Sequence, residues 1–141
     1  MSMDKMPERS PKIREDYIKM VEDQYFANVD LKDLEAVLDC FHHDAVFVVQ
    51  SAFSTHEGRD TGIKEMFERL FRNYAPKILH SNFRHVVDVP KGCCASQFSV
   101  ENISAYDGTE AVMSNCNFFY FDGEKIKSVY VYMSGGQNTL G

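Results

Sequence analysis

The sequence contains no tryptophan, no Cys-x-x-Cys spacing and no apolar run long enough to cross a membrane. A membrane-spanning helix needs about 20 mainly apolar residues, so we expect no membrane segment. The four cysteines are Cys40, Cys93, Cys94 and Cys116, and adjacent Cys93 and Cys94 would point to opposite faces of a strand. These positions favour buried, reduced thiols over a disulfide or a zinc site.

Basic residues are also few and scattered. The chain of 141 residues has 15 Lys and Arg against 21 Asp and Glu, a formal net charge of −6. Nucleic acids select clustered basic surfaces, so we expect no nucleic-acid partner. The first sixteen residues lack the apolar core of a signal peptide, and we therefore expect a cytoplasmic protein.

Large aromatic rings are abundant by contrast, with 11 Phe and 7 Tyr in a chain that is 44% hydrophobic. One domain of this length can bury a sizeable core, and some of these rings must line that core or an apolar cavity. We expect a single domain over residues 13–134, with tails at 1–12 and 135–141.

Hydrophobic periodicity predicts the order of the elements. Apolar residues at helical spacing predict helices over 13–25, 31–41 and 63–74, with Asp30 as N-cap of the second and Asp60 or Thr61 as cap of the third. Residues 51–58 are expected to form a loop. Strands are predicted over 45–50, 80–89, 95–105, 110–121 and 126–133, and Gly-containing turns join the last four into a meander.

This order resembles the NTF2-like superfamily, in its SnoaL-like and ketosteroid-isomerase-like branches, over residues 13–134. The resemblance is carried by the apolar stripe ending in Phe41 and by four short segments, Tyr25-Phe26-Ala27, Asp44-Ala45-Val46-Phe47, Gly58-Arg59-Asp60 and Phe121-Asp122-Gly123. It implies an α+β, cystatin-like cone of order ααβαββββ, in which a bent antiparallel sheet wraps around a long helix. It also implies an apolar pocket at the open end and a homodimer.

The resemblance further places candidate site residues. The oxyanion-binding tyrosine and carboxylic acid of ketosteroid isomerases correspond to Tyr25 and Asn117 here, whereas their aspartate base corresponds to Val49. Valine cannot accept a proton, so we reject steroid isomerase activity. Strand alternation then gives further inward-facing residues. The complete set of candidate ligand-binding residues is Tyr25, Asn117, Asn102, Asn115, Val49, Phe67, Phe98, Val100, Phe119, Val131 and Met133.

Histidines are the remaining candidates for proton chemistry. In SnoaL-like relatives a histidine often opens the second strand and points inward, which corresponds to His80, and alternation would bring Asn82 and Arg84 to the same face. We expect His56 to border the pocket mouth and assign no role to His85. We expect no metal at His42-His43-Asp44, because a helix-end turn would splay these side chains apart.

Three functions stay open. The first is a pocket protein for a small, largely apolar molecule of polycyclic, polyketide, steroid or terpenoid type. The second is a lyase, isomerase or cyclase that uses His80 with Tyr25 and Asn117 and needs no cofactor. The third is a non-catalytic dimeric association module. Outward-facing rings predict the dimer interface, namely Phe118, Tyr120, Tyr130 and Tyr132.

Overall fold

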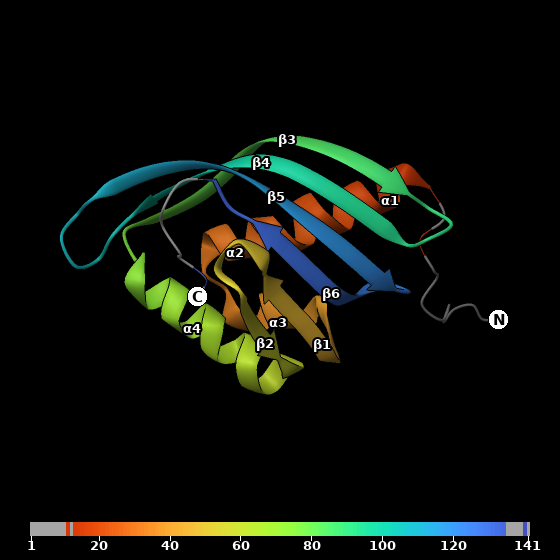
Figure 1. The fold of residues 1–141 in the computed structure, drawn as a ribbon, viewed down its shortest axis with the longest axis horizontal. Coiled ribbons are helices and arrows are strands. Elements are labelled where there is room, and N and C mark those ends of the chain that lie inside the picture. The colour runs from red at the N-terminus through yellow and green to blue at the C-terminus, as the bar shows by residue number, and fades with distance from the viewer. Residues whose placement is uncertain (1–10, 12, 135–139, 141) are drawn as a thin grey trace.

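The computed structural model describes residues 11, 13–134 and 140 (Figure 1). The expected tails therefore lie outside the described residues, apart from Pro11 and Leu140. The N-terminal helix is continuous and consists of α1 (Arg14–Lys19), a π-helical segment η1 (Met20–Phe26) and α2 (Ala27–Leu31). No helix among the described residues is long and apolar enough to cross a membrane.

The next elements are α3 (Leu34–Asp39), β1 (Phe41–Val49), a short 3-10 turn η2 (Gln50–Ala52) and β2 (Ser54–Glu57). A π-helical segment η3 (Gly58–Ile63) then leads directly into α4 (Lys64–Asn73). The predicted loop over 51–58 is thus wrong in part, because it contains β2, which pairs antiparallel with the end of β1. The remaining strands are β3 (Lys77–Asp88), β4 (Cys93–Ile103), β5 (Glu110–Asp122) and β6 (Lys125–Tyr132).

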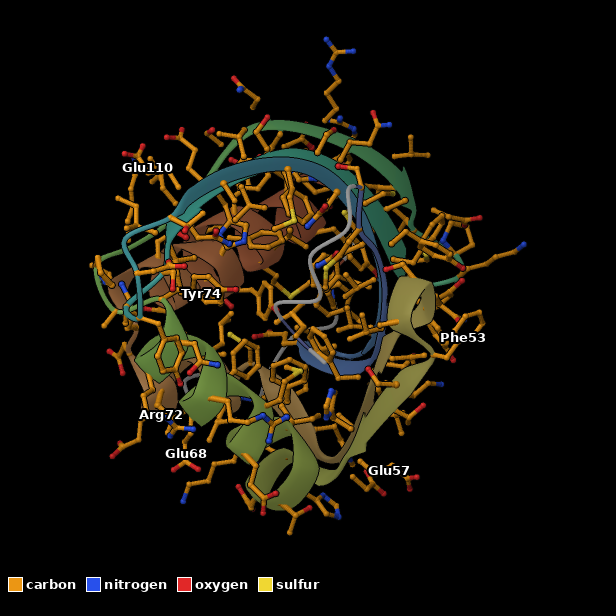
Figure 2. The ribbon with its side chains drawn as sticks, turned by 60° about the vertical axis from the view of Figure 1, so that its left-hand side comes forward. Phe53, Glu57, Glu68, Arg72, Tyr74 and Glu110 are labelled. Carbon is orange, nitrogen blue, oxygen red and sulfur yellow. The ribbon has the colours of Figure 1, made fainter. Side chains whose placement is uncertain are left out.

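All six strands form one curved sheet in the order β2-β1-β6-β5-β4-β3. The predicted meander of β3 to β6 is antiparallel throughout, whereas β1 pairs parallel with β6. The sheet curls around the helices, and side chains fill the space between its concave face and α4 (Figure 2). This is the α+β architecture expected from the sequence, with one additional strand.

The core is built from aromatic rings that the curved sheet and α4 share. Phe67 of α4 lies fully inside the fold, with ring centroids 5.9 Å from Phe47 and 6.2 Å from Phe41. The contact with Phe47 is edge-to-face and the one with Phe41 is tilted, and such ring contacts add to the stabilisation from burial. The predicted apolar stripe of α4 faces the sheet accordingly, with Ile63, Met66 and Leu70 also buried.

The connection between α2 and α3 differs from the prediction. Asp30 lies inside α2, and the N-cap of α3 is Asp33, whose carboxylate accepts a hydrogen bond of 3.2 Å from the amide of Ala36. Between them Lys32 adopts a left-handed conformation with φ of 57°, which ends the first helix. Leu31, expected on the buried stripe, is 75% exposed. Asp30 is consequently free to serve another purpose.

Candidate functional site

A small pocket lies under the curve of the sheet, with a volume of about 40 Å³. A buried water needs roughly 10–15 Å³ measured in this way, so the pocket has room for about three waters. Drug-sized ligands occupy sites of roughly 300–1,000 Å³. It is lined by Tyr25, Phe26, Val29, Phe67, Leu70, Ile78, His80, Phe98, Val100, Asn102, Asn115, Asn117, Val131 and Leu140.

Most of the sequence-predicted ligand residues meet in this lining. Three do not belong to it: Val49 and Phe119 are wholly buried in the core, and Met133 is half-buried beyond the end of β6. Val49 ends β1 and pairs with Val131, which does line the pocket. Val49, which the resemblance aligned with the base of ketosteroid isomerases, therefore lies next to the pocket lining and not in it.

The chemically most distinctive residue of the pocket wall is His80, which is paired with Asp30, a residue outside the lining itself. The carboxylate of Asp30 lies 2.6 Å from Nδ1 of His80 and also accepts the backbone amide of His80, at 3.1 and 3.2 Å. The side chains are only 20% and 10% exposed. No described residue is hydrogen-bonded to Nε2 of His80. We call this pair the Asp30–His80 dyad.

The ring of His80 packs against two aromatic rings that also contact each other. Its centroid lies 4.5 Å from that of Phe26 and 5.3 Å from that of Phe98. The carboxylate fixes the ring by one nitrogen, and the two phenyl rings restrict its rotation. A histidine oriented in this way presents its second nitrogen in a defined direction.

The strand that carries His80 is irregular just beyond it. The β3–β4 register shifts between Ser81 and Arg84, and Asn82 has a left-handed φ of 57°. This bulge reverses the alternation. The prediction that Asn82 and Arg84 share the face of His80 is therefore wrong, since both are exposed and Phe83 packs against the core instead.

Two asparagines supply the pocket with unused hydrogen-bond acceptors. Asn102 and Asn117 are each 3% exposed, and their Oδ1 atoms have no partner among the described residues. The third pocket amide, Asn115, is engaged, because its Oδ1 accepts the amide of Ser134 at 3.1 Å. Buried acceptors without a partner are unfavourable, so a ligand or water with donors would be stabilised here.

Tyr25 joins the pocket to the aromatic core. Its ring contacts Phe26, Phe119 and Phe41 at centroid distances of 4.8, 5.3 and 5.9 Å. Burial raises the pKa of Tyr25, so its hydroxyl stays protonated at neutral pH and can donate a hydrogen bond. The structure thus brings Tyr25, His80, Asn102 and Asn117 to one cavity.

The contact of Asp30 with His80 was not predicted, although the sequence contains a pattern that indicates it. Glu22, Phe26 and Asp30 recur every fourth position and share one face of the continuous N-terminal helix. That face packs on β3, and each carboxylate meets a histidine there, Asp30 with His80 and Glu22 with His85 at 2.5 Å. Ending the predicted helix at residue 25 hid this pattern.

The Glu22–His85 pair continues to Ser96, whose Oγ lies 2.8 Å from Nδ1 of His85. Ser96 and the neighbouring Cys94 are fully buried, and neither lines the pocket around His80. Burial also raises the pKa of Cys94, which keeps its thiol protonated. A nucleophile needs access to its substrate, and these buried groups have none. We therefore assign the cluster a structural role, in which it fastens the helix to the sheet.

A second, larger hollow of about 1,060 Å³ lies outside the fold, between α3 and η3. Its lining is mostly charged and includes Arg59 and Asp60, which pair with each other at 3.0 Å. It holds neither the dyad nor the unpartnered amides. His80 and the unpartnered amide oxygens of Asn102 and Asn117 lie in the smaller pocket.

Comparison with known proteins agrees with this architecture. The profile of the SnoaL-like domain matches residues 23–129. No curated protein matches the chain.

Three solved structures illustrate the likeness in fold. A proposed polyketide cyclase from Pseudomonas putida KT2440 has 20% identity and a TM-score of 0.72, over 80% of this chain and 87% of that one. A protein of ketosteroid isomerase-like fold from Catenulispora acidiphila, in complex with trimethylamine, has 15% identity and a TM-score of 0.71 over 81% and 84%. An NTF2-like protein of unknown function from Cytophaga hutchinsonii has 14% identity and a TM-score of 0.64 over 84% and 96%. The predicted NTF2-like, cystatin-like fold class is confirmed.

Proposed function

Because the chain belongs to the SnoaL-like domain family, we propose that its pocket binds a compact, largely apolar molecule and that the Asp30–His80 dyad moves a proton on it. The dyad is the observation that carries this proposal. A carboxylate on one ring nitrogen fixes the tautomer, so that the other nitrogen is the basic one. Nε2 of His80 is that nitrogen.

The chemistry follows from the arrangement of donors and acceptors around Nε2. The imidazole takes a proton from an acidic carbon or hydroxyl of the ligand, and Asp30 stabilises the imidazolium that forms. The imidazolium then returns the proton to another atom of the ligand. Such a sequence performs isomerisation, loss of water or ring closure without a cofactor.

Tyr25 supports the charge that develops when the proton leaves. Its buried hydroxyl is a donor in a water-poor cavity, where a hydrogen bond to an oxyanion is worth most. The acceptors of Asn102 and Asn117 favour a ligand that also carries hydroxyl or amino donors. A steroid isomerisation of the related type stays rejected, because Val49 supplies no base at the strand end.

Two solved structures of similar fold also support the proposal, which itself rests on the dyad. One structural neighbour is a proposed cyclase of polyketides, a class of molecule rich in hydroxyl and carbonyl groups. Another was solved with trimethylamine, a compact molecule. A compact, oxygenated ring matches the polarity of this pocket, and its entry requires the lining to widen.

Single-ring probes test binding and proton transfer separately. Phenol should bind about tenfold or more tightly than toluene, because toluene leaves the amide oxygens unpaired. Asn117→Leu should remove most of that preference. Exchange of the α-protons of cyclohexanone in heavy water, followed by NMR, reports proton transfer, and His80→Gln should slow the catalysed exchange by about 10²–10⁴-fold.

The matched control is Asp23→Asn, which changes an exposed carboxylate on the same N-terminal helix. It should leave binding and exchange unchanged. Binding of phenol without any exchange above background would refute the catalytic part and leave a ligand carrier. Failure of both probes to bind would refute the pocket proposal itself.

A second candidate function, dimeric association, is favoured by the outer face of the sheet. Phe118 packs edge-to-face on Tyr132 at 6.0 Å, and Tyr120 on Tyr130 at 5.8 Å. Tyr132 is 46% exposed. We propose that a second copy of the chain covers these rings. Light scattering at tens of micromolar should give a dimer, and a monomer would contradict the proposal.

A further inference from the structure

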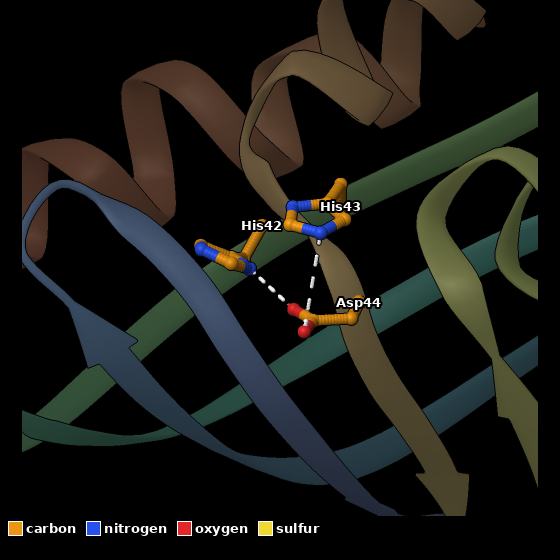
Figure 3. Close-up of side chains that lie close together, drawn as sticks. All are labelled: His42, His43 and Asp44. Carbon is orange, nitrogen blue, oxygen red and sulfur yellow. Dashed lines mark hydrogen bonds and ion pairs between the residues drawn. The ribbon is translucent and has the colours of Figure 1, made fainter.

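Three consecutive side chains converge at the start of β1, far from the pocket. Nδ1 of His42 lies 2.5 Å from Oδ1 of Asp44, and Nε2 of His43 lies 4.0 Å from the other carboxylate oxygen. One nitrogen from each ring and one carboxylate oxygen all fall within 4.8 Å of one another. Figure 3 shows both rings directed at the carboxylate. We call these residues the His-His-Asp cluster.

The backbone of β1 explains why they converge. Phe41 pairs with Ile126 of β6, and Val46 pairs with Ser128. An advance of five residues along β1 therefore corresponds to an advance of only two residues along β6. Pairing with β2 begins only at Val46. Residues 42–45 therefore have no ladder partner among the described residues, and this irregularity suspends the usual alternation of faces.

The burial pattern agrees with this account. Phe41 and Ala45 point into the core, whereas all three residues between them face outward. A regular strand would send His43 to the side opposite His42 and Asp44. The expectation that these side chains splay apart is therefore not met by the structure.

We propose that His42, His43 and Asp44 bind a divalent transition-metal ion of the zinc, nickel and copper class. Imidazole nitrogen and carboxylate oxygen are ligands that these ions prefer, whereas magnesium and calcium select oxygen-only sites. Metal–ligand bonds of about 2.0–2.2 Å place neighbouring donor atoms roughly 3–3.5 Å apart. The cluster reaches that arrangement by small rotations of exposed side chains.

The charge state of the cluster suits a cation. The carboxylate of Asp44 lies beside a nitrogen of each ring, at 2.5 Å from His42 and 4.0 Å from His43, and so places an anionic ligand between two neutral ones. The competing thiols are poorer ligands, because burial raises the pKa of each described cysteine. Three ligands leave coordination positions open for water or for a donor from another molecule.

The cluster is independent of the proposed pocket function. Asp44 stands five residues before Val49, a distance of about 16 Å along a strand, and it is Val49 that pairs with pocket-lining Val131. The His-His-Asp cluster is thus a surface site at the other end of β1. Loss of metal there should leave pocket binding of phenol unchanged.

Titration of the full chain with zinc chloride in a non-chelating buffer tests the proposal. Calorimetry should show one equivalent bound, and a His42→Ala/His43→Ala double variant should bind at least about tenfold more weakly. Asp44→Asn, which preserves shape, should weaken binding in the same direction. His56→Ala is the matched control and should bind like the wild type, since His56 lies in β2 outside the cluster.

Spectroscopy identifies the ligands and covers the case in which a variant folds poorly. With zinc, the ring nitrogens of His42 and His43 should shift in histidine-selective NMR of the wild type, while those of His80 and His85 stay in place. With cobalt, the absorption spectrum should lack thiolate charge-transfer bands. Zinc shifts at other histidines, thiolate bands, or equal affinity in the double variant would each overturn the proposal.

Discussion

Replacing Asp30 by asparagine tests the element that organises the pocket. Both carboxylate oxygens accept the backbone amide of His80, and one also accepts Nδ1–H. Asparagine has nearly the same shape but only one acceptor oxygen, and its NH₂ group would face one of these donors. The change therefore removes a charge-assisted contact between residues fifty positions apart and leaves the fold otherwise intact.

The expected cost follows from the partial burial of the pair. A hydrogen bond to a charged group contributes about 1.5–3 kcal/mol, and these side chains are 20% and 10% exposed. We expect Asp30→Asn to lower the free energy of unfolding by about 1.5–3 kcal/mol. In a domain of this size that corresponds to a melting temperature lower by about 5–10 °C.

Urea denaturation at neutral pH measures the stability, and histidine-selective NMR reports which ring nitrogen of His80 carries the proton. The wild type should show the Nδ1–H tautomer, and the variant should show a mixture. The control Asp23→Asn should change stability by less than about 0.5 kcal/mol, as exposed substitutions do. A variant with wild-type stability and an unchanged tautomer would refute the assignment of the dyad.

Three further predictions concern other parts of the fold. A Cβ at Gly62 would lie 2.7 Å from backbone atoms of Glu57, so Gly62→Ala should destabilise the protein by about 1–3 kcal/mol in urea denaturation, and wild-type stability would contradict the packing of η3 on β2. Burial raises the pKa of the Cys40 thiol to about 11 from 9.0, so the folded state favours the thiol, and stability is lost as pH rises between these values. Between about pH 8 and pH 10.5 the free energy of unfolding should fall by about 2 kcal/mol more in the wild type than in Cys40→Ala. Parallel pH profiles of the two proteins would contradict this burial. Leu140 lines the pocket, so Leu140→Ala should raise the affinity for 1-naphthol relative to phenol by about tenfold, as measured by calorimetry. An unchanged affinity ratio would show that Leu140 does not limit the size of the pocket.

Sequence patterns predicted the fold best where the strands are regular. The β4–β5 ladder runs without a shift from Cys93 to Ile103, and alternation placed Phe98, Val100 and Asn102 inward as observed. The same reasoning turned Tyr130 and Tyr132 outward, and the alternating Val129 and Val131 lie buried on the other face. Alternation is reliable there because every residue is fixed by a ladder partner.

The failures occur where the backbone departs from a regular period. The bulge at Asn82 reversed the faces of β3, and the irregular start of β1 gathered the His-His-Asp cluster on one side. The helix was predicted to end near Tyr25, but it continues to Leu31 and so carries Asp30 to His80. A single sequence does not reveal such shifts, because they depend on contacts between distant segments.

Pocket volume is the property that bears most directly on the choice of ligand. The sequence suggested polycyclic molecules, yet a cavity of about 40 Å³ holds only about three waters. Every residue in its lining belongs to a helix or a strand except Leu140, whose carbonyl lies 2.8 Å from Nε2 of His56. Even a single-ring ligand therefore has to displace lining side chains, among which Leu140 is the one outside a regular element, and a polycyclic ligand has to displace more of them. Since binding energy spent on rearrangement is lost to affinity, the structure favours the compact class.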